Sequence, residues 1–87
     1  MPIIHGTDGN DSLVGTNTAD IMYGGNGNDR IHGQDDNDYV LGGAGNDTIS
    51  GGNGNDQLFG DGTSPGGNDL IFGGAGEDRL YGDGGDD

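Results

Sequence analysis

Residues 24–32 read Gly-Gly-Asn-Gly-Asn-Asp-Arg-Ile-His, and this nine-residue unit recurs along the chain. Close copies occupy residues 42–50, 51–59 and 73–81, the last with Glu77 at the fifth position. The sixth position is always an aspartate, and an aliphatic residue or Met follows two residues later. The aspartates are Asp11, Asp20, Asp29, Asp38, Asp47, Asp56, Asp69, Asp78 and Asp87, and the hydrophobes are Leu13, Met22, Ile31, Val40, Ile49, Leu58, Ile71 and Leu80. A short fixed period of this kind is typical of stacked units, each supplying one carboxylate and one core residue.

Each unit has two parts with different structural preferences. The first six positions hold mostly Gly, Asn and Asp, which accept positive φ and turn the chain sharply. The last three positions alternate outward, inward and outward, as a minimal strand does. Two units complete one coil of 18 residues, so stacked coils form two short-stranded parallel sheets with the inward hydrophobes between them. The pattern predicts an all-β parallel β-roll (β-helix) of about four and a half 18-residue coils.

The composition limits both the size of the core and the partners. The 87 residues suffice for one small domain, only 26% are hydrophobic, and there is no cysteine. Small domains with so little core usually need disulfides, a metal or oligomerisation, and the lack of cysteine leaves metal as the leading candidate. Sixteen acidic residues against two basic ones give a net charge of −14, which excludes nucleic acid and anionic membranes as direct partners. No membrane span and no N-terminal signal peptide are recognisable.

The pattern GG-x-G-x-D-x-U-x resembles the RTX (repeats-in-toxin, haemolysin-type calcium-binding) nonapeptide repeat family, over residues 6–87. The resemblance implies a right-handed parallel β-roll with Ca²⁺ held in its turns. It also implies that the repeat aspartates are ligands together with backbone carbonyls at positions one to four. In the best-matching turns these carbonyls belong to Gly24, Gly25, Asn26, Gly27, Gly42, Gly43, Ala44, Gly45, Gly51, Gly52, Asn53, Gly54, Gly73, Gly74, Ala75 and Gly76.

The spacing supports calcium independently of the resemblance. Neighbouring coils lie about 4.7–4.9 Å apart, and calcium–oxygen bonds are about 2.3–2.6 Å long. An ion between equivalent aspartates on adjacent coils can therefore touch both. The pairs are Asp11/Asp29, Asp20/Asp38, Asp29/Asp47, Asp38/Asp56, Asp47/Asp69, Asp56/Asp78 and Asp69/Asp87, which allows up to about seven ions. Without metal these like charges repel, so we expect the chain to fold only when calcium binds.

Three departures from the pattern carry further expectations. Thr18 and Asp36 stand at the fourth position of turns 15–20 and 33–38, so the Asp20/Asp38 pair is predicted to be the weakest complete site. Four additional residues precede Asp69, and we assign them to an inserted loop at 60–66. Residues 1–5 are a lead-in strand, and 82–87 is an uncapped last turn. The whole of 1–87 is thus expected to be one calcium-binding module of a longer secreted protein.

One outer face is unusually apolar. The outward residues of alternate strands gather there on one sheet: Ile21, Tyr23, Tyr39, Leu41, Phe59 and Tyr81. Such a patch favours self-association or docking of a neighbouring domain. Rows of aromatic side chains that stabilise adjacent strands are the alternative, and the sequence leaves both open.

No arrangement of catalytic residues is recognisable, since His5 and His32 lack partners at catalytic or zinc spacing. The leading interpretation is a non-catalytic calcium-binding module that folds outside the cell and supports the secretion and stability of a parent protein. The resemblance implies type I secretion from a Gram-negative bacterium. Two alternatives stay open: an accessory substrate-binding module of an extracellular enzyme, such as a protease, lipase or alginate epimerase, and a calcium-stiffened adhesin or surface-layer spacer.

Overall fold

The chain forms a parallel β-roll, as the repeat predicts. In the computed structural model, which describes residues 3–60 and 68–81, each nine-residue unit contributes one three-residue strand. The strands are β1 (Ile3–His5), β2 (Ser12–Val14), β3 (Ile21–Tyr23), β4 (Arg30–His32), β5 (Tyr39–Leu41), β6 (Thr48–Ser50), β7 (Gln57–Phe59), β8 (Leu70–Phe72) and β9 (Arg79–Tyr81). The described part of the chain contains no helix that could cross a membrane.

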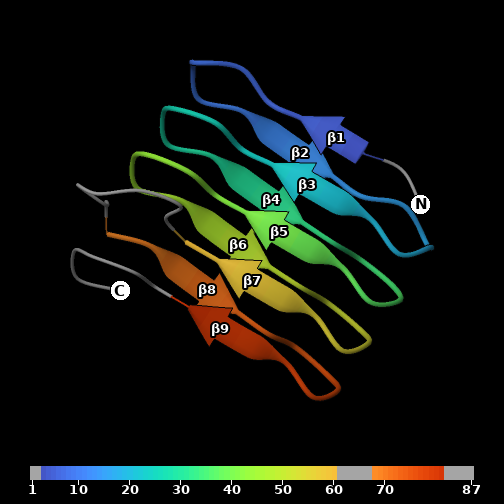
Figure 1. The fold of residues 1–87 in the computed structure, drawn as a ribbon. Coiled ribbons are helices and arrows are strands. Elements are labelled where there is room, and N and C mark those ends of the chain that lie inside the picture. The colour runs from blue at the N-terminus through green and yellow to red at the C-terminus, as the bar shows by residue number, and fades with distance from the viewer. Residues whose placement is uncertain (1–2, 61–67, 82–87) are drawn as a thin grey trace.

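Odd- and even-numbered strands separate into two parallel sheets that face each other (Figure 1). The first sheet has the order β1-β3-β5-β7-β9, and the second has the order β2-β4-β6-β8. Residues 18 apart are partners, as Leu13 is to Ile31 and Met22 is to Val40. Between β6 and β8 the offset becomes 22, with Thr48 opposite Leu70. The four additional residues therefore lie between these strands without disturbing the register. Apart from Gly60, the predicted loop 60–66 falls outside the described residues.

The core is one column of hydrophobic side chains between the sheets. Met22, Ile31, Val40, Ile49 and Leu58 are fully buried, and Leu13 and Ile71 pack against them. All of these are eighth-position hydrophobes, and Ile4 of β1 joins them from ahead of the first complete unit. Leu80 of β9, predicted to be buried, is 48% exposed because no later described strand covers it. A core only one residue wide leaves much of the stability to the turns at the two edges.

Among the turns that the structure describes completely there are three kinds, and we name them by their first two residues. The Gly-Gly turns are 24–29, 42–47, 51–56 and 73–78; the Gly-Thr turns are 6–11 and 15–20; the Gly-Gln turn is 33–38. Turns leading from odd to even strands form one edge of the roll, and those leading from even to odd strands form the other (Figure 1). Each turn ends in a repeat aspartate, so each edge carries a row of carboxylates.

Candidate metal centre

The repeat aspartates lie at the two edges of the roll, where each turn enters the following strand; those from Asp20 to Asp69 are buried, and Asp11 and Asp78 are half-buried. Asp20, Asp29, Asp47 and Asp56 are each 1% exposed, and Asp38 is 3% exposed. A buried carboxylate is costly unless it is hydrogen-bonded, paired with a positive charge or bound to a metal. The surroundings of these carboxylates therefore indicate what the turns can hold.

From Asp29 to Asp78, one oxygen of each repeat carboxylate is held by the neighbouring coil. The Asp29 amide donates to Asp47 Oδ1 at 2.9 Å, and the Asp38 amide donates to Asp56 Oδ1 at 2.8 Å. The same bond joins the pairs Asp11/Asp29, Asp20/Asp38, Asp47/Asp69 and Asp56/Asp78. The spatial pairing expected from the sequence is thus confirmed for six pairs, while Asp87 lies outside the described residues. No pattern in the sequence predicts that Oδ1 accepts an amide hydrogen.

The second oxygen is different. Oδ2 of Asp29, Asp38, Asp47 and Asp56 is buried, and within the described residues it accepts no hydrogen bond. Buried polar atoms without a partner are rare in native structures, and a bound ion or water molecule is a standard explanation. Four such atoms in equivalent positions mark the turns as a place for a cation.

Each Oδ2 atom faces the first glycine of its own turn. A Cβ built on Gly42 would lie 2.7 Å from Asp47 Oδ2 and 2.6 Å from the Gly60 carbonyl oxygen. On Gly51 it would lie 2.5 Å from Asp56 Oδ2 and 2.9 Å from the Gly73 carbonyl oxygen. Neither glycine has a positive φ. Close oxygen atoms, and not backbone conformation, therefore require glycine at the first position.

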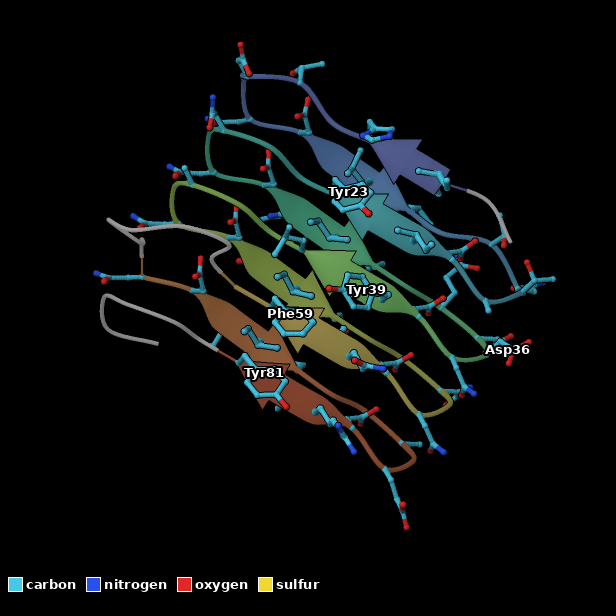
Figure 2. All side chains as sticks on the ribbon, viewed as in Figure 1. Tyr23, Asp36, Tyr39, Phe59 and Tyr81 are labelled. Carbon is cyan, nitrogen blue, oxygen red and sulfur yellow. The ribbon has the colours of Figure 1, made fainter. Side chains whose placement is uncertain are left out.

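The second and fourth positions require glycine because of the backbone itself. In turn 42–47, Gly43 has φ 91° and Gly45 has φ 98°, and all four Gly-Gly turns repeat this pattern. Gln34 and Asp36 hold the same two positions in the Gly-Gln turn at φ 79° and 73°. Residues 33–38 depart from the repeat pattern in sequence. Their backbone nevertheless keeps the shape of the Gly-Gly turns, so Gln34 and Asp36 adopt a left-handed conformation that is strained for residues with a side chain. Figure 2 shows Asp36 at the outer edge of its turn.

The environment opposes ionisation of these carboxyl groups when no cation is present. Burial, reinforced by the neighbouring carboxylates, raises the pKa of Asp47 to about 7 despite the hydrogen bond from the Asp29 amide. Burial likewise raises the pKa of Asp38 to about 7, with repulsion from Asp56, Asp20 and Asp36 adding to it. The pKa values of Asp29 and Asp56 are also raised, chiefly by burial. A divalent cation would reverse this tendency by favouring the ionised form.

A second row of hydrogen bonds keeps the turns aligned without metal. The Asn28 amide donates to Asn10 Oδ1 at 2.7 Å, and the Asn46 amide donates to Asn28 Oδ1 at 2.8 Å. On the other edge, the Glu77 amide donates to Asn55 Oδ1 at 2.8 Å, so Glu77 takes part through its backbone. These bonds run from a later coil to an earlier one, opposite to the aspartate bonds. Sequence reasoning missed this function of the fifth position.

The Gly-Thr turns surround their aspartates differently. The Thr7 amide donates to Asp11 Oδ2 at 2.6 Å, and the Thr16 amide donates to Asp20 Oδ2 at 2.7 Å. No residue of turns 6–11 and 15–20, both fully described, has a positive φ. These two turns therefore differ from the others in backbone shape as well as in hydrogen bonding.

The donor set of the Gly-Gly turns fits calcium. Within residues 3–60 and 68–81, no group of three or more His, Cys, Asp or Glu side chains gathers as a metal site. Side chains alone therefore cannot supply the six to eight oxygens that calcium prefers, and backbone carbonyls must provide the remainder. Carbonyl oxygens do border the Oδ2 atoms, as Gly60 and Gly73 show. Hard oxygen donors in flexible glycine-rich loops suit calcium better than magnesium or zinc.

The comparison with protein families agrees with this chemistry. The model of the RTX calcium-binding nonapeptide repeat (4 copies) matches residues 5–40, 32–63 and 66–87. A comparison with curated proteins gives no match.

Proposed function

The chain belongs to the RTX calcium-binding nonapeptide repeat family, and from this premise we propose that it is a non-catalytic module that folds around calcium ions held in its turns. The observation that carries the proposal is the row of buried Oδ2 atoms without a hydrogen-bond partner at Asp29, Asp38, Asp47 and Asp56. These are also the carboxyl groups whose pKa is raised by burial.

The aspartate Oδ2 atoms are the side-chain ligands in this proposal. Carbonyl oxygens at the first four positions of the Gly-Gly turns supply the remaining ligands, as the resemblance to the RTX family implies. Asp78, whose Oδ1 accepts the Asp56 amide, continues one edge, and Asp69 continues the other. Calcium, when bound, supplies the positive charge that makes a row of buried carboxylates favourable.

Folding coupled to calcium also suggests where the module works. Burying the repeat carboxylates without a cation is unfavourable, and the chain carries a net charge of −14. At low calcium concentration the chain therefore remains unfolded, which suits passage through a type I secretion system of a Gram-negative bacterium. Outside the cell, where calcium is more abundant, the roll folds and stabilises its parent protein. This agrees with weak extracellular calcium sites, whose Kd is about 10⁻⁴–10⁻³ M.

Calcium titration followed by calorimetry and by circular dichroism tests the proposal. We expect strand signal to appear in step with several equivalents of bound calcium and to disappear with excess chelator. Asp38→Asn should abolish the binding of at least one equivalent. Asp35→Asn is the matched control, because Asp35 lies three residues away in the same turn. Within residues 3–60 and 68–81, its exposed carboxylate accepts only the Asn53 side-chain amide, at 3.0 Å. A full strand signal in chelator, without any heat of calcium binding, would refute the proposal.

The apolar outer face of the first sheet is better explained by contacts among its own side chains than by docking. The rings of Phe59 and Tyr81 stack at 4.8 Å with an interplanar angle of 7°, and those of Tyr39 and Phe59 lie 5.2 Å apart. His5 stacks on Tyr23 at 5.1 Å. Figure 2 shows Tyr23, Tyr39, Phe59 and Tyr81 following one another along the stack. The rings thus contact one another in two groups, His5 with Tyr23 and Phe59 with Tyr39 and Tyr81, which supports the interpretation of aromatic contacts that hold adjacent strands together.

Self-association or docking through this face stays a prediction. Sedimentation of the calcium-loaded chain tests it, because a monomer at all protein concentrations would favour the aromatic contacts alone. Dimers that disappear in Tyr39→Ser would favour association, since Tyr39 is 40% exposed and lies near the middle of the face.

A further inference from the structure

The first turn on each edge of the roll satisfies its own carboxylate. In the Gly-Thr turns, Asp11 Oδ2 accepts the Thr7 amide and Asp20 Oδ2 accepts the Thr16 amide. The corresponding oxygen in Asp29, Asp38, Asp47 and Asp56 has no such partner. The oxygen that would face a cation elsewhere in the roll therefore faces an amide hydrogen in these two turns.

The threonine hydroxyls complete the arrangement at the other oxygen. In later coils, Oδ1 accepts the amide of the aspartate one coil earlier, as Asp47 does from Asp29. In the Gly-Thr turns the hydroxyl replaces that amide: Thr7 Oγ1 lies 2.9 Å from Asp11 Oδ1, and Thr16 Oγ1 lies 2.8 Å from Asp20 Oδ1. Both carboxylates are thus satisfied without an earlier coil.

Each hydroxyl is itself held in place by its own turn. Thr7 Oγ1 accepts the Gly9 amide at 3.2 Å, and Thr16 Oγ1 accepts the Thr18 amide at 3.2 Å. The Thr7 hydroxyl can then donate its own hydrogen to Asp11 Oδ1. The Thr16 hydroxyl, which also lies 2.9 Å from the Thr18 hydroxyl, can accept from it and donate to Asp20 Oδ1. The two turns therefore form small closed networks.

The Gly-Gln turn shows that the hydroxyl matters more than the mere absence of glycine. Gln34 occupies the same second position as Thr7 and Thr16, yet it adopts a positive φ and leaves Asp38 Oδ2 without a partner. When the second-position side chain makes no hydrogen bond to the carboxylate of its own turn, as with Gln34, the backbone thus has the conformation of the Gly-Gly turns.

We propose that the Gly-Thr turns are a calcium-independent cap, in which Thr7 and Thr16 take the place of both the cation and an earlier coil. The proposal rests on the calcium function proposed above and limits it, because the pairs Asp11/Asp29 and Asp20/Asp38 then lack one side-chain ligand each. Calcium sites begin with Asp29 on one edge and Asp38 on the other. Five of the seven aspartate pairs remain, which lowers the largest possible number of ions from seven to five.

The number of calcium equivalents bound by the full chain, measured by calorimetry, tests the cap. The wild type should bind at most five equivalents. Asp11→Asn should leave that number unchanged, whereas Asp47→Asn should lose up to two, because Asp47 belongs to two pairs. A wild type that binds seven equivalents, or an Asp11→Asn variant that loses one, would overturn the cap while the calcium function stands. A wild type that binds no calcium would overturn the function itself, and the cap with it.

A gain of binding provides the second test. Thr7→Gly turns residues 6–11 into Gly-Gly-Asp-Gly-Asn-Asp, which matches the repeat pattern in full. This variant should bind one equivalent more than the wild type, whereas Thr7→Ser keeps the hydroxyl and should bind the same number. Equal stoichiometry in Thr7→Gly and Thr7→Ser would overturn the assignment of Thr7 as the determinant.

Discussion

Alanine at Gly9 and alanine at Gly45 change the same repeat position on the same edge, yet we expect opposite effects on stability. Gly45 has φ 98°, and a Cβ there would lie 2.7 Å from the carbonyl carbon of Gly27 and closer still to its oxygen. Gly9 has no positive φ, and a Cβ there would meet only Thr7 Oγ1, at 3.7 Å. The two positions thus differ in both conformation and space.

The size of each effect follows from these differences. Placing a side chain in the left-handed region costs about 1–2 kcal/mol, and forcing it against packed atoms typically costs a further 1–3 kcal/mol or so. Either substitution also restricts the unfolded chain, which stabilises the fold by about 0.4–1 kcal/mol. Gly45→Ala should therefore lower the free energy of unfolding by about 2–4 kcal/mol, and Gly9→Ala should raise it by about 0.4–1 kcal/mol.

Thermal unfolding in saturating calcium, followed by circular dichroism, measures both effects. For a domain of this size, 1 kcal/mol shifts the Tm by about 4–8 °C. Gly45→Ala should thus lower the Tm by at least about 8 °C, and Gly9→Ala should raise it by about 2–8 °C. Equal losses in the two variants would show that turn 6–11 has the same backbone as turn 42–47, and would refute the distinction between Gly-Thr and Gly-Gly turns.

Three further predictions concern other parts of the roll. In the calcium-free fold, burial raises the pKa values of Asp38 and Asp47 from 3.8, the value for an ordinary aspartate, to about 7. The stability that these two protonated groups contribute is therefore fully present below pH 3.8 and is lost as the pH rises through 7. Circular dichroism of decalcified protein should show strand content falling between about pH 4 and pH 8, and a signal that rises across this range would contradict the burial of these groups. Gln34→Gly should raise the free energy of unfolding by about 0.5–1 kcal/mol, because glycine removes the strain at φ 79° but loses more chain entropy on folding. A loss of stability in chemical denaturation would show that the Gln34 side chain is needed. Phe59→Ala removes two ring contacts, each worth about 0.5–1.5 kcal/mol beyond burial, whereas Val14→Ala, on the outer face of the other sheet, should change stability by no more than about 0.5 kcal/mol. Equal effects of these last two substitutions would argue against a stabilising effect of the aromatic contacts.

The fold could be predicted because two constraints of the sequence act together. A strand alternates its side chains, so a hydrophobe in the middle of each three-residue strand must point inward. A fixed unit length then places Met22, Val40 and Leu58 above one another in one sheet. The same alternation predicted that the strand register would continue after the insertion before Asp69. A shift by one residue would turn the inward hydrophobes outward, whereas the observed register places Ile71 beside Ile49.

Finer features of the metal centre could not be predicted, because they depend on the direction of backbone groups. The sequence shows that Asp29 and Asp47 share one edge. It does not show that the Asp29 amide donates to Asp47 Oδ1, or that the buried Asp47 Oδ2 has no hydrogen-bond partner among the described residues. The alignment of turns through Asn28 and Asn46 was hidden in the same way. Both contacts need the relative orientation of two coils, which periodicity alone does not contain.

Thr7 and Thr16 are a different case, since a signal was present and was not used. Each stands four residues before a repeat aspartate, close enough for a short hydroxyl to return to the carboxylate, and each lies in the first turn of its edge. Counting aspartates treats every carboxylate as equivalent, although a buried oxygen without a hydrogen-bond partner needs a cation more than one that already accepts an amide hydrogen. The second position of the unit therefore carries information that the sixth does not. By this criterion a Gly-Gly turn, or one like that of Gln34, predicts a metal ligand, and a Gly-Thr turn predicts a cap.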